Sequence, residues 1–424
     1  MIDILNTKLA FTYIMIFLLL FQSTLEFLLG NTIVSYIDEI FIAIVFFIAL
    51  INIFKYKRIS KISLNILVVI IIFVSTGFIS GILNSKYVMK NLVLSSFLSC
   101  KFFLLIFSIS NIKLSDEFKK YTLSAIKFFG GVCLVFALFN MLFPNIYFKL
   151  FPFAIQDYRM GFLCITSLFY HPGIYGWFML LVSLLYFSDY VSDKNKKSLY
   201  LALLYCLFSV LCFRSKVIIS IIIILFYQLI IRKKIQLKKI ILVLVFSITI
   251  YLIFGELLKK TYNLYILGNS GDTTARQLLL INSFKLMREY FPLGVGFGKY
   301  GSWYSAVNYS EIYYKMGMNT TWGLTPEKRA YITDTFWPSI IGETGILGTI
   351  VYIVFIKNIY DIILSYNKKN NDKYSYFSLM IFIQLICESL GAPSFNSAPQ
   401  NIIVGLIIGI MLSTIIYNKK VKVS

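Results

Sequence analysis

The chain has 424 residues, of which 58% are hydrophobic and only 14% are charged, and its mean hydropathy is +0.79. This composition excludes a soluble globular protein, because the polar residues are too few to cover its surface. The formal net charge of +21 could attract nucleic acid, but the Lys and Arg residues stand between apolar runs and form no basic face. No nucleic-acid partner is therefore expected.

Apolar runs of about 20 residues recur from one end of the chain to the other, and each can cross a hydrocarbon layer about 30 Å thick as a helix. We therefore predict an all-α integral membrane protein of about 12 transmembrane helices. The first run lacks a small-residue cleavage site and is followed at once by more spans, so it is expected to be retained and not removed as a signal peptide. The predicted spans are 9–29, 34–54, 62–82, 92–110, 121–143, 173–190, 198–213, 217–231, 240–256, 338–356, 376–392 and 400–417.

These spans divide the chain into three parts. Residues 1–256 form an N-terminal bundle of about nine helices, residues 257–337 form one long loop, and residues 338–424 form a C-terminal bundle of about three helices. The cysteines lie scattered, mostly in apolar runs, and contain no CxxC pair, which is typical of packing residues. They are Cys100, Cys133, Cys164, Cys206, Cys212 and Cys387.

The distribution of positive charge predicts the orientation of the spans. More than half of the 40 Lys and Arg residues lie in segments on one side of the predicted membrane, whereas the short loops on the other side carry few. Because cytoplasmic loops of membrane proteins are enriched in Lys and Arg, this side and both termini are predicted to be cytoplasmic. The loop 257–337 is then exoplasmic.

Two exoplasmic segments are too long for simple turns. Residues 144–172 mix aromatic with charged residues and are expected to lie along the membrane interface. Within 257–337, the stretch GDTTARQLLLINSFKLMREY places Asp272 and Thr274 ahead of a helical pattern, so one reclining helix is predicted there. Long ordered loops on a rigid scaffold often carry chemistry.

Four exoplasmic cations are placed where the phosphate of a lipid head group would lie. Arg159 lies in the first outer segment, Arg214 and Lys216 lie in a tight turn between two spans, and Arg276 lies at the start of the loop helix. Arg binds phosphate oxygens bidentately and is costly near hydrocarbon, so this set predicts an anionic ligand. The alternative for each is a cation that anchors a helix end at the interface.

Three further residues could take part in proton transfer. His171, the only histidine, stands before Pro172 at a predicted helix start, where it is either an acid or base or a polar residue at the helix end. Asp334 and Glu343 flank the start of the span that follows the loop, and either could be a general base. The alternatives are a helix cap for Asp334 and a structural partner for Glu343.

The stretch FPLGVGFGKYG contains GxGxxG at Gly296, Gly298 and Gly301, but a helix and not a strand is predicted before it. A nucleotide site is therefore not expected. A tight turn of the backbone, which approaches a ligand or shapes the loop, is the better interpretation.

Taken in order, these stretches resemble the O-antigen polymerase and O-antigen ligase superfamily, over roughly residues 155–355. The shared features are an Arg-x-Gly before a His-Pro, an Arg in a turn between spans, an Arg that opens a helix before a Pro-Leu-Gly-x-Gly turn, and an Asp before a Glu-x-Gly. The matching residues are Arg159, Gly161, His171, Pro172, Arg214, Arg276, Pro292, Leu293, Gly294, Gly296, Asp334, Glu343 and Gly345.

The sequence also departs from the pattern of that superfamily. Phe213 stands where a Ser commonly precedes the Arg of the turn, and Thr335 stands where an Asn commonly follows the Asp or His. Ligases of the superfamily carry a His in the long loop, and residues 257–337 contain none. This last departure favours a polymerase over a ligase.

The resemblance implies a metal-independent glycosyltransferase of the bacterial cytoplasmic membrane, without a cofactor. Its substrates would be oligosaccharides linked to undecaprenyl diphosphate, which it would join into O-antigen, capsular or exopolysaccharide at the outer face, with a chain-length regulator and a flippase as possible partners. A ligase-type transferase and a non-enzymatic flippase or exporter are the alternatives.

Specific roles follow for the candidate residues. Arg159, Arg214 and Arg276, helped by Lys216, would stabilise the charge of the leaving diphosphate. Asp334 is the first candidate, and His171 the second, for accepting the proton of the attacking hydroxyl. Single displacement would invert the anomeric carbon, because the sequence shows no pair of carboxylates for a covalent route.

Overall fold

The computed structural model describes residues 9–30, 32–57, 59–84, 88–231, 237–263, 274–370 and 372–417, and they are mostly helical. Among them the only strands are the two-residue β1 (Tyr158–Arg159) and β2 (Phe162–Leu163), paired antiparallel. The α-helices are α2 (Leu9–Leu20), α3 (Gln22–Leu29), α4 (Ile37–Tyr56), α5 (Lys61–Leu83), α6 (Met89–Ser110), α7 (Asp116–Leu142), α8 (Pro144–Leu150), α9 (Pro172–Asp193), α10 (Lys196–Val210), α11 (Ser215–Ile231), α12 (Leu237–Tyr262), α13 (Ala275–Glu289), α14 (Trp303–Val307), α15 (Glu311–Lys315), α16 (Trp337–Asn370), α17 (Lys373–Ser389) and α18 (Gln400–Tyr417), and a 3₁₀ turn, η1 (Thr32–Tyr36), precedes α4.

The length and composition of these helices make the chain a multi-pass membrane protein. Seven helices are long and apolar enough to cross a membrane, and the bent pair α2 and α3 could form an eighth span. Each of the twelve predicted spans coincides with a helix or, at 9–29, with this pair. The count of twelve stays a prediction, because α10 has only 15 residues and α11 and α17 have only 17 each, about 22–26 Å of helix.

The first predicted span is broken into two helices and is not the single helix expected from its apolar sequence. Helices α2 and α3 meet at an angle of 77°. Polar contacts hold the second piece in place: the Gln22 amide donates to Asp38 Oδ1 at 2.9 Å, and the Thr24 hydroxyl donates to the Leu168 carbonyl at 2.8 Å. These two bonds bring α3 between α4 and the segment before α9.

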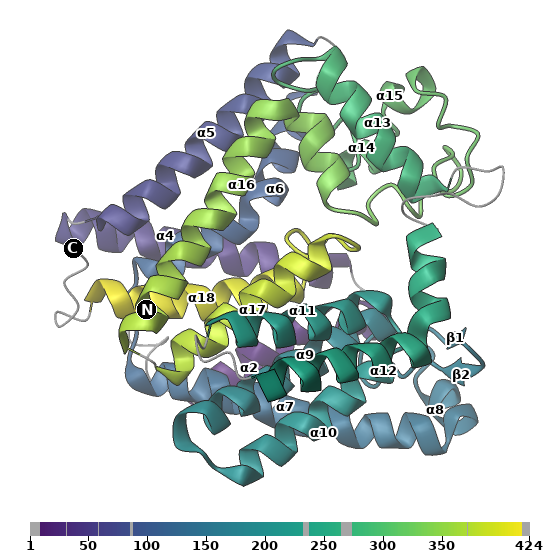
Figure 1. The fold of residues 1–424 in the computed structure, drawn as a ribbon. Coiled ribbons are helices and arrows are strands. Elements are labelled where there is room, and N and C mark those ends of the chain that lie inside the picture. The colour runs from purple at the N-terminus through teal and green to yellow at the C-terminus, as the bar shows by residue number, and fades with distance from the viewer. Residues whose placement is uncertain are drawn as a thin grey trace.

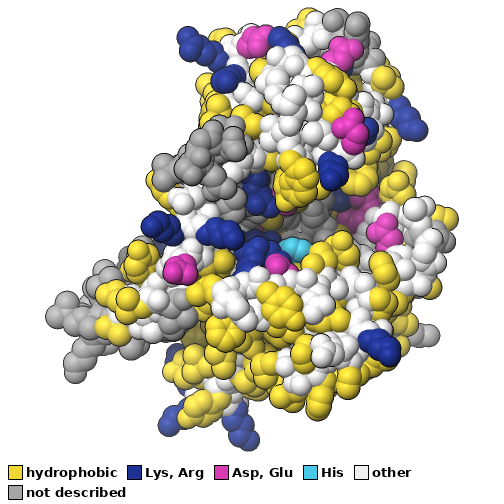
Figure 2. Space-filling view, turned by 90° about the vertical axis from the view of Figure 1, so that its right-hand side faces the viewer, with side chains coloured by type: hydrophobic (Ala, Val, Ile, Leu, Met, Phe, Trp, Pro, Cys, Tyr) yellow, Lys and Arg dark blue, Asp and Glu magenta, His cyan; other side chains and the backbone are white. Residues whose placement is uncertain are grey.

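Figure 1 shows how the helices are arranged. Helices α2, α7, α9, α10, α11, α12, α17 and α18 form a body, and α5 and the first part of α16 extend from it. The segment 274–336, with α13, α14 and α15, packs at the far end of α5 and α16, and is called here the loop lobe. Figure 2 shows a hollow in the surface between the loop lobe and the body.

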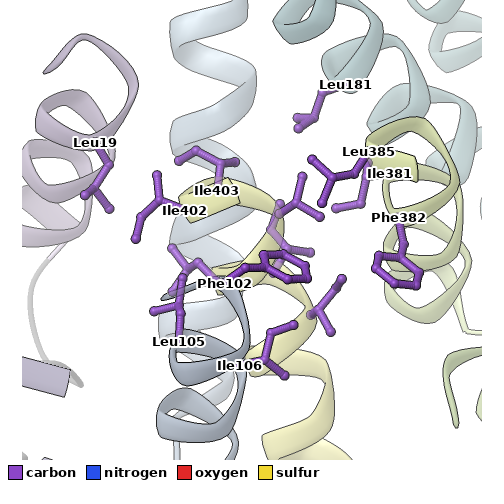
Figure 3. Close-up of a cluster of buried hydrophobic side chains, with 14 of the residues drawn as sticks. Leu19, Phe102, Leu105, Ile106, Leu181, Ile381, Phe382, Leu385, Ile402 and Ile403 are labelled. Atoms are coloured by element: carbon purple, nitrogen blue, oxygen red, sulfur yellow. The ribbon is translucent and has the colours of Figure 1, made fainter. Parts of the chain in front are cut away.

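The core of the body surrounds α18, which is buried along most of its length. Gly405 and Gly409 let α18 approach α6 closely, because a Cβ at these positions would lie 2.9 Å from Leu105 and 2.6 Å from Ile109. Side chains of α2, α6, α9, α17 and α18 meet there, as Figure 3 shows. They include Leu19, Phe102, Leu105, Ile106, Leu181, Ile381, Phe382, Leu385, Ile402 and Ile403.

The loop lobe contains the predicted reclining helix, α13, which begins after Thr274 and packs on α16. The Thr274 hydroxyl accepts a hydrogen bond from the Gln277 amide at 3.3 Å, so the predicted Thr cap is confirmed. Asp272, part of the segment 232–239 and the tail from residue 418 lie outside the described residues. Helix α12 runs to Tyr262, so the long loop begins later than residue 257.

Candidate functional site

The hollow between the loop lobe and the body has positively charged side chains on its walls. Figure 2 shows dark blue Lys and Arg side chains in the hollow around one cyan histidine, which is the only histidine of the chain, His171. The body contributes the hairpin of β1 and β2, the start of α9 and the turn from α10 to α11. The loop lobe contributes the start of α13.

His171 lies at the N-terminus of α9 and caps it. Its Nδ1 accepts the Gly173 amide proton at 3.0 Å, and Pro172 takes the first helical position, as expected for the capping alternative. Burial, followed by the charges of Arg214, Lys216, Arg159 and Arg276 in that order, lowers the pKa of His171 from 6.5 to about 3. The imidazole is therefore neutral at pH 7 with its proton on Nε2, and all four predicted cations act on this one side chain.

Two of these cations share one carboxylate. Arg214 donates from Nη2 to Asp157 Oδ2 at 2.8 Å, and Arg159 donates from Nε to the same oxygen at 3.4 Å. Burial and the neighbouring Arg159 lower the pKa of Arg214. Its Nε is buried and has no hydrogen-bond partner within the described residues. Asp157 therefore leaves one positive charge uncompensated here.

Lys216 forms an ion pair with Glu388, whose carboxylate comes from α17 and is fully buried. The Lys216 Nζ lies 3.0 Å from Glu388 Oε2. The stem of Lys216 passes so close to α9 that a Cβ at Gly173 would lie 3.0 Å from Lys216 Cε and equally close to His171 Nδ1. Gly173 thus lets Lys216 reach the side of His171.

Arg276 pairs with Asp334, so the two candidate residues of the loop lobe contact each other. Arg276 donates from Nε to Asp334 Oδ2 at 2.6 Å and from Nη2 to the same oxygen. The guanidinium also lies over the ring of Tyr331, with its Cζ 5.2 Å from the centroid. Both charged side chains remain partly exposed, at 26% for Arg276 and 32% for Asp334.

The glycine-rich turn and Glu343 connect the loop lobe to α16. Glu343 is buried, and its Oε1 accepts hydrogen bonds from the amides of Lys299 and Tyr300 at 2.9 Å and from the Ser302 hydroxyl at 2.6 Å. Gly294 and Gly345 bring the turn and the helix into backbone contact, since a Cβ on Gly294 would lie 2.5 Å from the Gly345 nitrogen. The GxGxxG motif shapes the loop and fastens it to α16.

Three residues of the candidate site were not predicted from the sequence. Asp157 and Glu388 hold the cations of the body, and Tyr331 supports Arg276. Asp157 stands close to Arg159 in the sequence and Tyr331 stands close to Asp334, whereas no sequence signal links Glu388 to Lys216. A scan against models of known protein families finds no match, and a search of curated proteins also finds none. In the part of the chain that the structure describes, no three His, Cys, Asp or Glu side chains are placed to hold a metal ion.

Proposed function

We propose that this protein is a polysaccharide polymerase of the bacterial cytoplasmic membrane, which transfers glycan chains between polyprenyl diphosphate carriers. One observation carries the proposal: the charges of Arg159, Arg214, Lys216 and Arg276 all act on the neutral His171 in one hollow. Within the described residues, Asp157 pairs with both Arg159 and Arg214, Glu388 pairs with Lys216, and Asp334 pairs with Arg276. Two guanidinium groups of the body therefore share one carboxylate. Such a site favours a ligand of concentrated negative charge.

A diphosphate fits this arrangement better than a single carboxylate would. Guanidinium groups bind phosphate oxygens through paired N–H donors, and here they come from two opposite walls of the hollow. The neutral imidazole adds one N–H donor at Nε2. In a multi-pass membrane protein, a diphosphate ligand with an apolar tail is the lipid carrier that the sequence motifs indicate.

The reaction requires no group beyond the chain and its two substrates. The acceptor hydroxyl attacks the anomeric carbon of the donor, and the bond from that carbon to the diphosphate oxygen breaks with its electron pair on the leaving diphosphate. Arg159, Arg214 and Lys216 stabilise that charge from the body. His171 donates a hydrogen bond from Nε2, a role that its low pKa favours over proton acceptance.

Asp334 receives the proton of the acceptor hydroxyl in this proposal. Arg276 holds its carboxylate through one oxygen, and the exposure of both side chains leaves them room to move. When Arg276 turns to the diphosphate, Asp334 is released beside the anomeric carbon. Inversion of that carbon follows from the single displacement.

The test is single replacement of Arg214 and Arg276 by Ala and by Lys, scored by the ladder of glycan lengths in cells with equal amounts of the protein. We expect both Ala variants to lose the ladder, with partial return for Lys, which keeps the charge but not the paired donors. Arg329→Ala is the matched control, because Arg329 lies in the loop lobe, and its contacts within the described residues are with backbone carbonyls and the ring of Tyr309. Wild-type ladders from both Ala variants would end the diphosphate assignment.

Two further results separate the alternatives. Full activity of Asp334→Asn would remove Asp334 as the base. In a deletion strain, single repeat units displayed outside indicate a missing polymerase, units trapped inside indicate a missing flippase, and long polymer without its final anchor indicates a missing ligase.

A further inference from the structure

Phe213, which directly precedes Arg214, has a backbone conformation that bulky residues avoid. Its φ is +47°, in the left-handed region where glycine is favoured. The same position carries a Ser in the pattern that the sequence resembles. A large side chain persists in such a conformation only where its surroundings hold it there.

The ring of Phe213 lies between two other aromatic rings. It stacks on Phe162 of β2, with ring centroids 5.5 Å apart and an interplanar angle of 7°. On another side it contacts Phe254 of α12, with centroids 6.0 Å apart. Phe162 is 61% exposed, whereas Phe254 is buried. The three rings form an aromatic row from the hairpin to α12.

The aromatic row begins beside two cations of the body, Arg159 and Arg214. The pairing of the strands places Phe162 directly opposite Arg159, and Phe213 is the neighbour of Arg214. Both guanidinium groups bind Asp157. Figure 1 shows the hairpin beside α12. The same two elements carry further exposed apolar side chains, among them Tyr158 and Met160 of the hairpin and Ile248, Tyr251 and Leu252 of α12.

We propose that the stacked rings of Phe162 and Phe213 seat the first isoprene units of the lipid whose diphosphate binds at Arg159 and Arg214. This inference rests on the proposed function and adds where the tail leaves the site. Head group and tail are joined directly, so the tail must begin next to the cations. The flat rings match the planar double bonds of a polyprenyl chain.

The stack should prefer a polyprenyl tail because the rings and the tail are in direct contact, and not because the tail is removed from water. A tail in the bilayer is already in an apolar medium, so moving it onto protein gains little hydrophobic free energy. Dispersion between flat, closely packed groups is what distinguishes the stack from the surrounding acyl chains. The stack should therefore select a polyprenyl tail over a saturated one by a modest factor, about fivefold.

The experiment measures binding of three probes to the full chain in nanodiscs: inorganic diphosphate, a polyprenyl diphosphate, and a saturated alkyl diphosphate of equal carbon number. The variants are Phe162→Ala and Phe213→Gly. Glycine accepts a φ of +47°, so Phe213→Gly removes the ring without forcing Arg214 to move. Phe128→Ala is the control, because Phe128 is 54% exposed on α7 and also contacts a second ring, that of Phe129.

Wild type and the control are expected to bind the polyprenyl probe about fivefold more tightly than the saturated one. Both variants should lose this selectivity and keep their affinity for inorganic diphosphate. Unchanged selectivity in both variants would overturn the inference alone. Equal weakening of all three probes would also overturn it, and would make the stack a positioning element for Arg214. Failure of wild type to bind any probe would overturn the proposed function and this inference with it.

Discussion

Glu343 and Asp157 are both carboxylates near the junction of the loop lobe and the body, and they differ in what surrounds them. Glu343 Oε1 accepts three hydrogen bonds from one turn of the loop lobe, and the side chain is almost fully buried. Asp157 accepts from two guanidinium groups and is 33% exposed. The first carboxylate satisfies the groups around it, whereas the second is outnumbered by cations.

This difference separates scaffold from site among residues that look alike in the sequence. Glu343, Arg159 and Arg214 all belong to the motifs of the resemblance, but among the described residues the two Arg side chains share the single carboxylate of Asp157. A buried polar group whose partners are all internal contributes to folding. A partly exposed cluster of like charges is costly to the chain alone, and in the proposed function the diphosphate offsets that cost.

The largest expected effect on stability is at Glu343. Glu343→Ala leaves the Lys299 and Tyr300 amides and the Ser302 hydroxyl without their acceptor, at a cost of about 4 kcal/mol in the free energy of unfolding. Denaturant unfolding in detergent, followed by circular dichroism, measures it. A variant as stable as the wild type would mean that the glycine turn is held by its backbone contacts alone.

Replacement of Lys216 should have the second-largest effect on stability, because its partner Glu388 is more deeply buried than Lys216 itself. Lys216→Met leaves Glu388, which is 0% exposed, without a counter-charge, and should cost about 3 kcal/mol. The double variant Lys216→Met with Glu388→Leu should recover most of that loss. If the double variant is no better than the single one, Lys216 stabilises the body by packing and not by charge.

His171 should make stability depend on pH in the acidic range. Its pKa is about 3 in the folded protein and 6.5 in the unfolded chain, so between these values the unfolded chain binds more protons. Stability is then fully present above pH 6.5 and falls as the pH drops towards 3, by about 1 kcal/mol per pH unit. His171→Gln should flatten this part of the profile.

Binding of inorganic diphosphate gives a second test of the pKa of His171. A bound anion offsets the four cations and raises the pKa of His171 in the folded protein towards its unfolded value, so with diphosphate bound the acidic loss of stability should be smaller and should level off at a higher pH than without it. Equal profiles with and without diphosphate, at concentrations that bind, would place the anion away from His171.

The smallest effect on stability is expected at Arg276. Its ion pair with Asp334 is partly exposed, so Arg276→Met should change the free energy of unfolding by less than about 1 kcal/mol. The same variant should abolish the glycan ladder. Loss of stability comparable to that of Glu343→Ala would assign Arg276 to the scaffold.

Local patterns made much of the fold predictable. Apolar length located the helices of the predicted spans, and the Thr274 and His171 caps follow from short-range rules. The bend between α2 and α3 was missed because its causes, the contacts of Gln22 with Asp38 and of Thr24 with Leu168, join residues far apart in the chain. An apolar run carries no signal of such partners.

The cations of the candidate site could be predicted from the sequence, but of their carboxylate partners only Asp334 was singled out. Arg159, Arg214, Lys216 and Arg276 were singled out because positive charge is unusual on the predicted outer side. Asp157 and Glu388 look ordinary in the sequence, and the stack of Phe162 on Phe213 depends on strand pairing. Which carboxylate meets which cation is set by tertiary packing.

Calorimetric titration of inorganic diphosphate into the full chain in nanodiscs tests the central claim most directly. The account predicts binding by the wild type that weakens as salt rises, is lost in the double variant Arg214→Ala with Arg276→Ala, and is retained in Arg329→Ala. Equal binding by the wild type and the double variant would contradict it, and so would a wild type that binds no diphosphate.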